Sequence, residues 1–93
     1  MQPETRFKMV VGKRLATIAH SWFVKVQMLA LRGVPDYLGV VNGRFVALEL
    51  KTEDGVVDGL QDWTLKRIAK CGGFVRVVRP SNLDEVINEL GEL

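Results

Sequence analysis

Cysteine and histidine are nearly missing from this sequence of 93 residues, which has one of each, Cys71 and His20. A single cysteine excludes a disulfide within the chain. One cysteine and one histidine together exclude a structural zinc site of the usual four-ligand kind. We therefore expect a protein of a reducing environment, the cytoplasm.

Long apolar runs are also missing. No stretch approaches the roughly 18 apolar residues that a membrane-spanning helix needs, so no membrane partner is expected. The first residues, "MQPETRFK", include an acid and no extended apolar segment, which does not fit a signal peptide. The net charge of +2, from 13 basic and 11 acidic residues, is too small to decide for or against a nucleic-acid partner.

The composition that remains is that of an ordinary folded protein, with 47% hydrophobic and 26% charged residues. No segment is biased enough to predict disorder, so we treat residues 1–93 as a single domain. At this length the core is only just large enough to hold a fold alone, which makes self-association a reasonable expectation.

Apolar residues recur at helical spacing from Pro3 to about Ala19 and predict a first helix with one inward stripe. The residues of this stripe are Phe7, Val10, Val11, Leu15 and Ile18. Extended backwards, the stripe includes Glu4 in the first turn, where the helix dipole favours a negative charge.

Three β-rich segments follow: "SWFVKVQM" (21–28), "DYLGVV" (36–41) and "RFVALELK" (44–51). The last two are separated by Asn42-Gly43, the strongest short signal for a two-residue hairpin turn. A second helix is predicted in "LQDWTLKRIAK" (60–70), which ends before Gly72-Gly73. "FVRVVR" (74–79) predicts a buried strand, and Ser81 is expected to cap a last helix.

The predicted order is therefore α-β-β-β-α-β-α. A helix that joins two strands of one sheet places them in parallel by a right-handed crossover, while the hairpin is antiparallel. We expect an α/β (α+β) fold with a mixed sheet flanked by helices.

The hairpin brings two carboxylates together. A two-residue turn pairs Val41 with Arg44, and counting outward from this pair places Asp36 opposite Glu49. Like charges opposed in this way are destabilising, by about 3 kcal/mol at ~5 Å and an effective dielectric near 20. Such a cost points to a purpose other than structure.

A shared proton or a divalent cation would remove the repulsion. Because side chains alternate along a strand, Glu49 and Lys51 point to one face, and Asp36 joins them there. The two acids, the backbone carbonyl of Leu50 and several waters form the oxygen ligand set that suits Mg²⁺ or Mn²⁺. A lysine beside such a metal can orient water and stabilise charge on a phosphate. The alternative is that Asp36 caps a turn and that Glu49 and Lys51 face solvent.

These residues resemble a known family. "GVPD" at 33–36, "ELK" at 49–51 and Gln61 at the start of a helix are similar to the motifs of the PD-(D/E)xK nuclease superfamily. Within it, the chain most resembles the small stand-alone virus-type replication-repair nuclease (VRR-NUC) domains of phages and bacteria. The similarity covers nearly the whole chain, including the "PE" that opens the first helix and the strand in "GGFVRVV".

The resemblance implies a restriction-endonuclease-like core. It also implies roles for five residues: Asp36 and Glu49 as metal ligands together with the carbonyl of Leu50, Lys51 as the catalytic lysine, and Gln61 and Glu4 as further site residues. The implied activity is Mg²⁺- or Mn²⁺-dependent cleavage of DNA by a homodimer, on branched DNA such as four-way (Holliday) junctions. It would serve DNA repair in the cytoplasm of a bacterial or phage-infected cell.

Two alternatives stay open at the level of sequence. One is a nuclease directed to flaps or strand ends, and the other is a non-catalytic nucleic-acid-binding module with the same fold. Arg32, Arg44, Arg76 and Arg79 are candidates for phosphate contacts. Trp22 and Trp63 are expected in the core or in a dimer interface.

Overall fold

The computed structural model describes residues 1–27 and 31–93, so Met28, the last residue of the first predicted strand, lies outside the description. The predicted order of helices and strands is confirmed, with one added 3₁₀ turn. The elements are α1 (Pro3–Leu15), β1 (Ser21–Lys25), β2 (Tyr37–Val41), β3 (Arg44–Leu50), α2 (Gly59–Lys70), β4 (Phe74–Val78), η1 (Pro80–Asn82) and α3 (Leu83–Gly91).

The four strands form one mixed sheet in the order β1-β2-β3-β4. Its first two pairs are antiparallel, and β3 and β4 are parallel, as the crossover through α2 requires. The hairpin register is confirmed: Val41 pairs with Arg44, and Tyr37 pairs with Leu48. Asn42 and Gly43 both have positive φ, 49° and 84°, which is the backbone that this turn requires.

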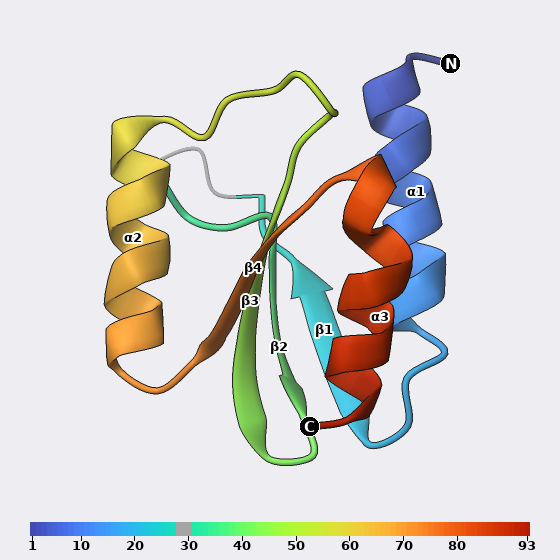
Figure 1. The fold of residues 1–93 in the computed structure, drawn as a ribbon, viewed down its shortest axis with the longest axis vertical. Helices are drawn as coiled ribbons and strands as arrows, with labels where there is room; N and C mark the ends of the chain where they lie inside the picture. The colour runs from blue at the N-terminus through green and yellow to red at the C-terminus, as the bar shows by residue number, and fades with distance from the viewer. Residues whose placement is uncertain (28–30) are drawn as a thin grey trace.

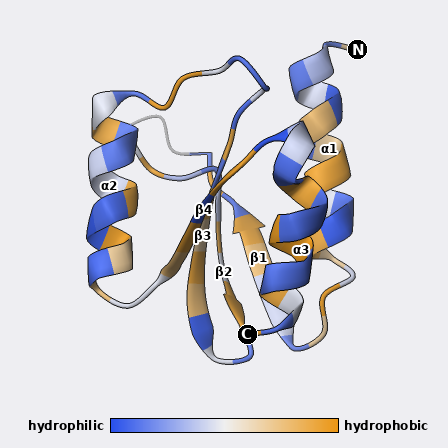
Figure 2. Cartoon of the chain, in the orientation of Figure 1, coloured by the Kyte–Doolittle hydropathy of each residue, from blue (hydrophilic) through white to orange (hydrophobic). Residues whose placement is uncertain are grey.

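Helices cover both faces of the sheet (Figure 1). α2 lies on one side, and α1 and α3 lie side by side on the other. The apolar sides of α1 and α3 face the sheet (Figure 2), and most of the core lies between them and the strands. This core contains Val11 and Leu15 from α1, Val86 and Leu90 from α3, and Val41, Val46, Leu48, Leu50 and Val78 from the strands.

Strand alternation in β3 assigns its side chains to the two faces. Val46, Leu48 and Leu50 belong to the core under α1 and α3. Their neighbours Ala47 and Glu49 therefore point to the opposite face, the one on which α2 lies. α1 and α3 thus lie on one side of the sheet, and the side chain of Glu49 lies on the other.

The first helix is shorter than predicted. It ends at Leu15, and Val10 of the expected inward stripe is 42% exposed. After Leu15 the hydroxyl of Thr17 donates to the carbonyl of Arg14 at 2.7 Å, a local hydrogen bond that competes with helix continuation. The chain then turns at His20, which has φ 54°, to enter β1.

The predicted cap at Ser81 is wrong. Asn82 stands at the N-cap position of α3 and makes no side-chain cap there, while Ser81 lies within η1. The Asn82 side chain instead accepts a hydrogen bond from the Arg79 amide and donates to the Val77 carbonyl, at 2.7 and 2.9 Å. These bonds hold the chain in a 3₁₀ turn before α3 begins. The hydroxyl of Ser81 donates a hydrogen bond to the carboxylate of Glu53.

β4 is an edge strand of the described sheet, although its apolar sequence predicted a buried one. Phe74 and Val78, at its ends, are buried, and its three central residues are half-buried. In the described part of the chain, no helix is both long and apolar enough to cross a membrane.

Candidate metal centre

Asp36 is held from two directions just before β2 begins. Its Oδ2 accepts a hydrogen bond of 2.8 Å from the amide of Leu50, at the end of β3. Its own carbonyl accepts a hydrogen bond of 2.8 Å from the amide of Val26, next to the end of β1. The backbone of Asp36 is therefore fixed by the chain next to β1, and its carboxylate is fixed by the end of β3.

Glu49 is a buried acid, only 3% exposed. The pKa of Glu49 is raised from 4.5 to about 7, mainly by burial and then by the neighbouring carboxyl group of Asp36, while the charge of Lys51 lowers it. The strand register, which pairs Tyr37 with Leu48, places Asp36 opposite Glu49 one step outward, as the sequence predicts.

Lys51 forms an ion pair with Glu49. Its Nζ lies 3.6 Å from Oε2 of Glu49, and its side chain is 22% exposed. Its backbone is fixed because its amide donates to the carbonyl of Val78 at 3.0 Å, which extends the β3–β4 ladder by one residue. The end of the hairpin therefore carries two neighbouring carboxylates, one of which pairs with an ammonium group.

Gln61 occupies the first turn of α2. Its amide donates to Oδ1 of Asp58 at 2.8 Å, and its Oε1 accepts from the Asp58 amide at 3.2 Å. This reciprocal pair is a capping box, which the sequence signals as an acid followed three residues later by glutamine. Gln61 is half-buried and lies one turn before the buried Leu65, on the side of α2 that faces the sheet.

Glu4 lies apart from this group. Its side chain is 69% exposed and pairs with Lys8, one turn along α1, at 3.5 Å. Among the described residues no hydrogen bond or ion pair joins Glu4 to Asp36, Glu49 or Lys51. The helix that carries it packs on the face of the sheet opposite to Glu49.

The group fits a hard divalent cation. No cluster of three or more histidine, cysteine, aspartate or glutamate side chains occurs in the described residues, so two carboxylates are the side-chain ligands available. Mg²⁺ and Mn²⁺ accept oxygen ligands and keep several waters, so two acids with a backbone carbonyl suffice. Burial and the neighbouring Asp36 disfavour the ionised form of Glu49, and a cation bound between the two acids would favour it.

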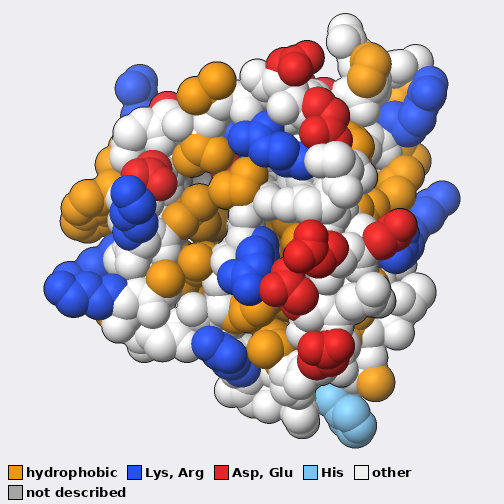
Figure 3. Space-filling model, viewed as in Figure 1, with side chains coloured by type: hydrophobic (Ala, Val, Ile, Leu, Met, Phe, Trp, Pro, Cys, Tyr) orange, Lys and Arg blue, Asp and Glu red, His pale blue; other side chains and the backbone are white. Residues whose placement is uncertain are grey.

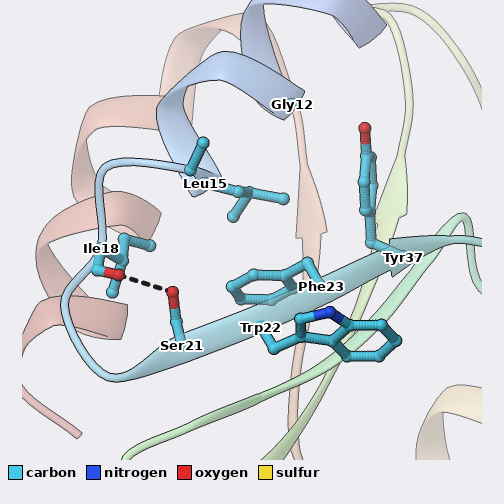
Figure 4. Close-up of a pocket in the computed structure, with 8 residues that line it drawn as sticks. Gly12, Leu15, Ile18, Ser21, Trp22, Phe23 and Tyr37 are labelled. Atoms are coloured by element: carbon cyan, nitrogen blue, oxygen red, sulfur yellow. Dashed lines mark hydrogen bonds between the residues drawn. The ribbon is translucent and has the colours of Figure 1, made fainter.

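The hollow shown in Figure 4 is a different feature. It lies between α1 and β1, has a volume of about 300 Å³, and its lining includes Leu15, Phe23 and Tyr37. Ser21 also borders it, and its hydroxyl donates to the carbonyl of Ile18 at 2.6 Å. Asp36, Glu49 and Lys51 do not line it, and its lining has no acid or base.

Surface charge is unevenly distributed (Figure 3). Basic side chains gather over α2 and acidic ones over α3. Arg76 is engaged with Glu89 through two hydrogen bonds, at 3.2 and 2.7 Å, and Arg79 donates to backbone carbonyls. Two of the four arginines predicted to contact phosphate are therefore occupied within the protein.

Together, the mixed sheet, the helices on both faces and the acid pair at the end of the hairpin define the restriction-endonuclease-like class of folds. A solved structure described as a VRR_NUC domain matches the chain with a TM-score of 0.80. The match covers 95% of this chain and 97% of the other, at 24% sequence identity. No family model and no curated protein matches the sequence. The chain has the VRR_NUC fold, which confirms the resemblance seen in the sequence at the level of structure.

Proposed function

We propose that this protein is a nuclease that hydrolyses phosphodiester bonds of DNA with Mg²⁺ or Mn²⁺. The observation that carries the proposal is the buried acid Glu49, which lies beside the half-buried Asp36 and pairs with Lys51. A structural role does not require two carboxylates at this place, because an apolar pair would stabilise the strands without the cost of burying charge. The VRR_NUC fold supports the same function.

The roles of the residues follow from their chemistry. Asp36, Glu49 and the carbonyl of Leu50 would hold the cation. When bound, the cation supplies a Lewis acid that lowers the pKa of water and balances charge on the phosphate. Lys51 orients the attacking water and stabilises negative charge on the phosphate as the new P–O bond forms and the bond to the leaving oxygen breaks.

Gln61 and Glu4 are proposed as further site residues. The amide group of Gln61 keeps donors for a phosphate or a water, because its capping bond uses Oε1. Glu4 pairs with Lys8, so its contribution depends on this pair opening when DNA binds. Exchange of Glu4 for glutamine is therefore expected to weaken cleavage less than the same exchange of Glu49.

We propose a homodimer acting on branched DNA, such as a four-way junction, in the cytoplasm of a bacterial or phage-infected cell. A two-fold dimer offers two sites to a substrate with two equivalent strands. One sheet face provides a surface for this contact. Trp22 pairs with Val40, and Val40 pairs with Phe45, so the three side chains form one row across three strands.

This row, Trp22, Val40 and Phe45, is 64%, 38% and 47% exposed, and it contains no charge. A phosphate backbone is recognised by positive charge, which the row lacks. An apolar surface of this kind fits another apolar surface, and in a two-fold dimer the same patch of the second copy supplies it.

The test is cleavage of four-way, flap and linear duplex DNA with Mg²⁺ or Mn²⁺. Wild-type protein is compared with Glu49→Gln and Lys51→Ala, and the exposed Glu92→Gln serves as the control. Metal-dependent cutting that both site variants lose and the control keeps is expected. Cutting of flaps or ends alone would support an end-directed nuclease, and binding without cutting would support a non-catalytic nucleic-acid-binding module.

A further inference from the structure

The loop after the lysine of the site is held by an arginine from another part of the chain. Nη1 of Arg79 lies within hydrogen-bonding distance of three carbonyls of this loop: those of Thr52 at 2.6 Å, Gly55 at 2.7 Å and Glu53 at 3.3 Å. Backbone carbonyls of a loop that has no ladder partner need donors, and one guanidinium supplies them here.

A second contact closes the same loop from its other side. The carboxylate of Glu53 accepts hydrogen bonds from the amide and the hydroxyl of Ser81, the latter at 2.9 Å. Arg79 and Ser81 both belong to the short connection between β4 and α3. The loop of residues 52–55 is thus fastened to this connection by its backbone and by one side chain.

The loop packs directly on the stem of Lys51. A Cβ atom placed on Gly55 would lie 3.4 Å from both Cβ and Cδ of Lys51 and 3.1 Å from Oγ1 of Thr52. The Gly55 amide also donates to the Thr52 carbonyl at 3.1 Å, which curls the loop back towards the lysine. A side chain at Gly55 would thus touch the lysine stem at an ordinary contact distance and crowd the Thr52 hydroxyl.

Lys51 and Arg79 stand at matched places in the sheet. Leu50 pairs with Val78, so each residue comes directly after the last pair of the parallel strands. The amide of Lys51 donates to the carbonyl of Val78, and the amide of Arg79 donates to the side chain of Asn82. Both backbones are therefore fixed, and the loop is held between them.

We infer that Arg79 is a positioning residue for Lys51. A lysine has four rotatable bonds, and an ammonium that must act at one point loses this freedom at a cost in entropy. By holding residues 52–55 against the stem, Arg79 lowers that cost and keeps Nζ near Glu49. The role in catalysis rests on the proposed nuclease function, whereas the effect on the lysine itself does not.

Four variants test the inference. Arg79→Gln removes the charged donor, and Arg79→Lys retains an ammonium that can reach the same carbonyls. Gly55→Ala leaves Arg79 intact but displaces the loop beside Lys51, because the added methyl group would lie 3.1 Å from Oγ1 of Thr52. The matched control is Arg76→Gln, which removes an arginine that also bridges two parts of the fold but contacts Glu89 instead of the loop.

The first measurement is independent of activity. The rate of acylation of the Lys51 amine, followed by mass spectrometry, and hydrogen exchange of the Gly55 amide report the order of the lysine and of its loop. Both rates are expected to rise severalfold in Arg79→Gln, and the acylation rate also in Gly55→Ala. The acylation and exchange rates of Arg79→Lys should lie between those of Arg79→Gln and those of the wild type. Unchanged rates in Arg79→Gln, or an equal rise in Arg76→Gln, would overturn the inference.

The second measurement is steady-state cleavage of DNA. Displacement of a catalytic group by about 1 Å can cost on the order of 100-fold in rate, so kcat of Arg79→Gln is expected to fall tenfold or more with a smaller change in KM. A rise in KM alone would assign Arg79 to DNA binding and overturn its positioning role. If wild type cuts no DNA, the proposed function fails, and the acylation rates still decide whether Arg79 orders Lys51.

Discussion

The amide of Leu50 donates a hydrogen bond to Oδ2 of Asp36, at 2.8 Å and across 14 residues of sequence. The bond joins the end of β3 to the residue that precedes β2. Glu49 is the neighbour of Leu50 in β3, so its side chain comes to lie beside the same carboxylate. The closeness of the two acids is therefore set by backbone contacts. A site fixed in this way is organised by the fold and needs little rearrangement when a ligand binds.

Substitution of Asp36 tests the repulsion between the acids. Asp36→Asn keeps an oxygen for the Leu50 amide and removes the charge, so the pKa of Glu49 should fall towards its ordinary value. At pH 8, without divalent metal, the variant is expected to be more stable than wild type by about 1–3 kcal/mol. Urea unfolding measures the difference. A loss of stability would show that the charge of Asp36 is favourable in the fold.

The pH dependence of stability follows from Glu49. Its pKa is about 7 in the folded protein against 4.5 ordinarily, so the folded state binds more protons between these values. Stability contributed by this group should be complete below pH 4.5 and fall as the pH rises to about 7, by up to about 1.4 kcal/mol per unit. The difference between wild type and Glu49→Gln in urea unfolding isolates this contribution. A difference that does not vary with pH would contradict the raised pKa.

Divalent metal should offset the loss of stability that ionisation of Glu49 causes at high pH. Mn²⁺ or Mg²⁺ is expected to raise Tm of the wild type more at pH 8 than at pH 5, because the ligands must be ionised. At a concentration 100 times Kd the gain is about 2.7 kcal/mol. Thermal unfolding with and without metal measures it, and Glu49→Gln should lose most of the gain. Equal stabilisation of both proteins would place the metal elsewhere.

Gly39 tests the packing of the edge strand that carries Trp22. A Cβ atom at Gly39 would lie 2.3 Å from the Trp22 carbonyl oxygen and 2.5 Å from Cδ1 of Phe23, so Gly39→Ala must displace β1. We expect a loss of about 1–3 kcal/mol in urea unfolding. Gly91→Ala is the control, because no atom lies within 4 Å of its added Cβ, and it should be neutral or stabilising. If Gly39→Ala has the same free energy of unfolding as the wild type, β1 can shift without loss of stability.

Substitution of the two exposed tryptophans tests which surface forms the proposed dimer. Trp22 and Trp63 are both 64% exposed, but Trp22 lies in the row across the sheet and Trp63 lies on α2. Sedimentation should show that Trp22→Lys shifts wild-type dimers to monomers, whereas Trp63→Lys does not. A wild-type monomer at micromolar concentration would count against the dimer, and an effect of Trp63→Lys alone would move the interface to α2.

The parts of the fold that local chemistry determines were predictable. Asn42-Gly43 fixes the hairpin register through its positive φ angles, and the register fixes which acids meet. The length of α1 and the cap of α3 were predicted wrongly because Thr17 and Asn82 form hydrogen bonds that compete with helix geometry. No periodicity in the sequence reports such competition.

Contacts between distant segments were not predictable in the same way. Arg79 was expected to contact phosphate, since an arginine near a proposed nuclease site has no sequence signal that distinguishes DNA from a loop carbonyl. The separation of Glu4 from the acids depends on which face of the sheet α1 covers, and helical spacing alone does not specify this. The capping box of Asp58 and Gln61, by contrast, was readable from their spacing and was missed.

The division of the sheet into two faces separates folding from chemistry. Val46, Leu48 and Leu50 hold the core under α1 and α3, while Glu49 and its partners occupy the other face of the same strand. A substitution at the acids therefore changes little of the packing that maintains the fold. Inactive variants should remain folded, which allows them to be mixed with wild-type subunits to ask whether one site of a pair can cut alone.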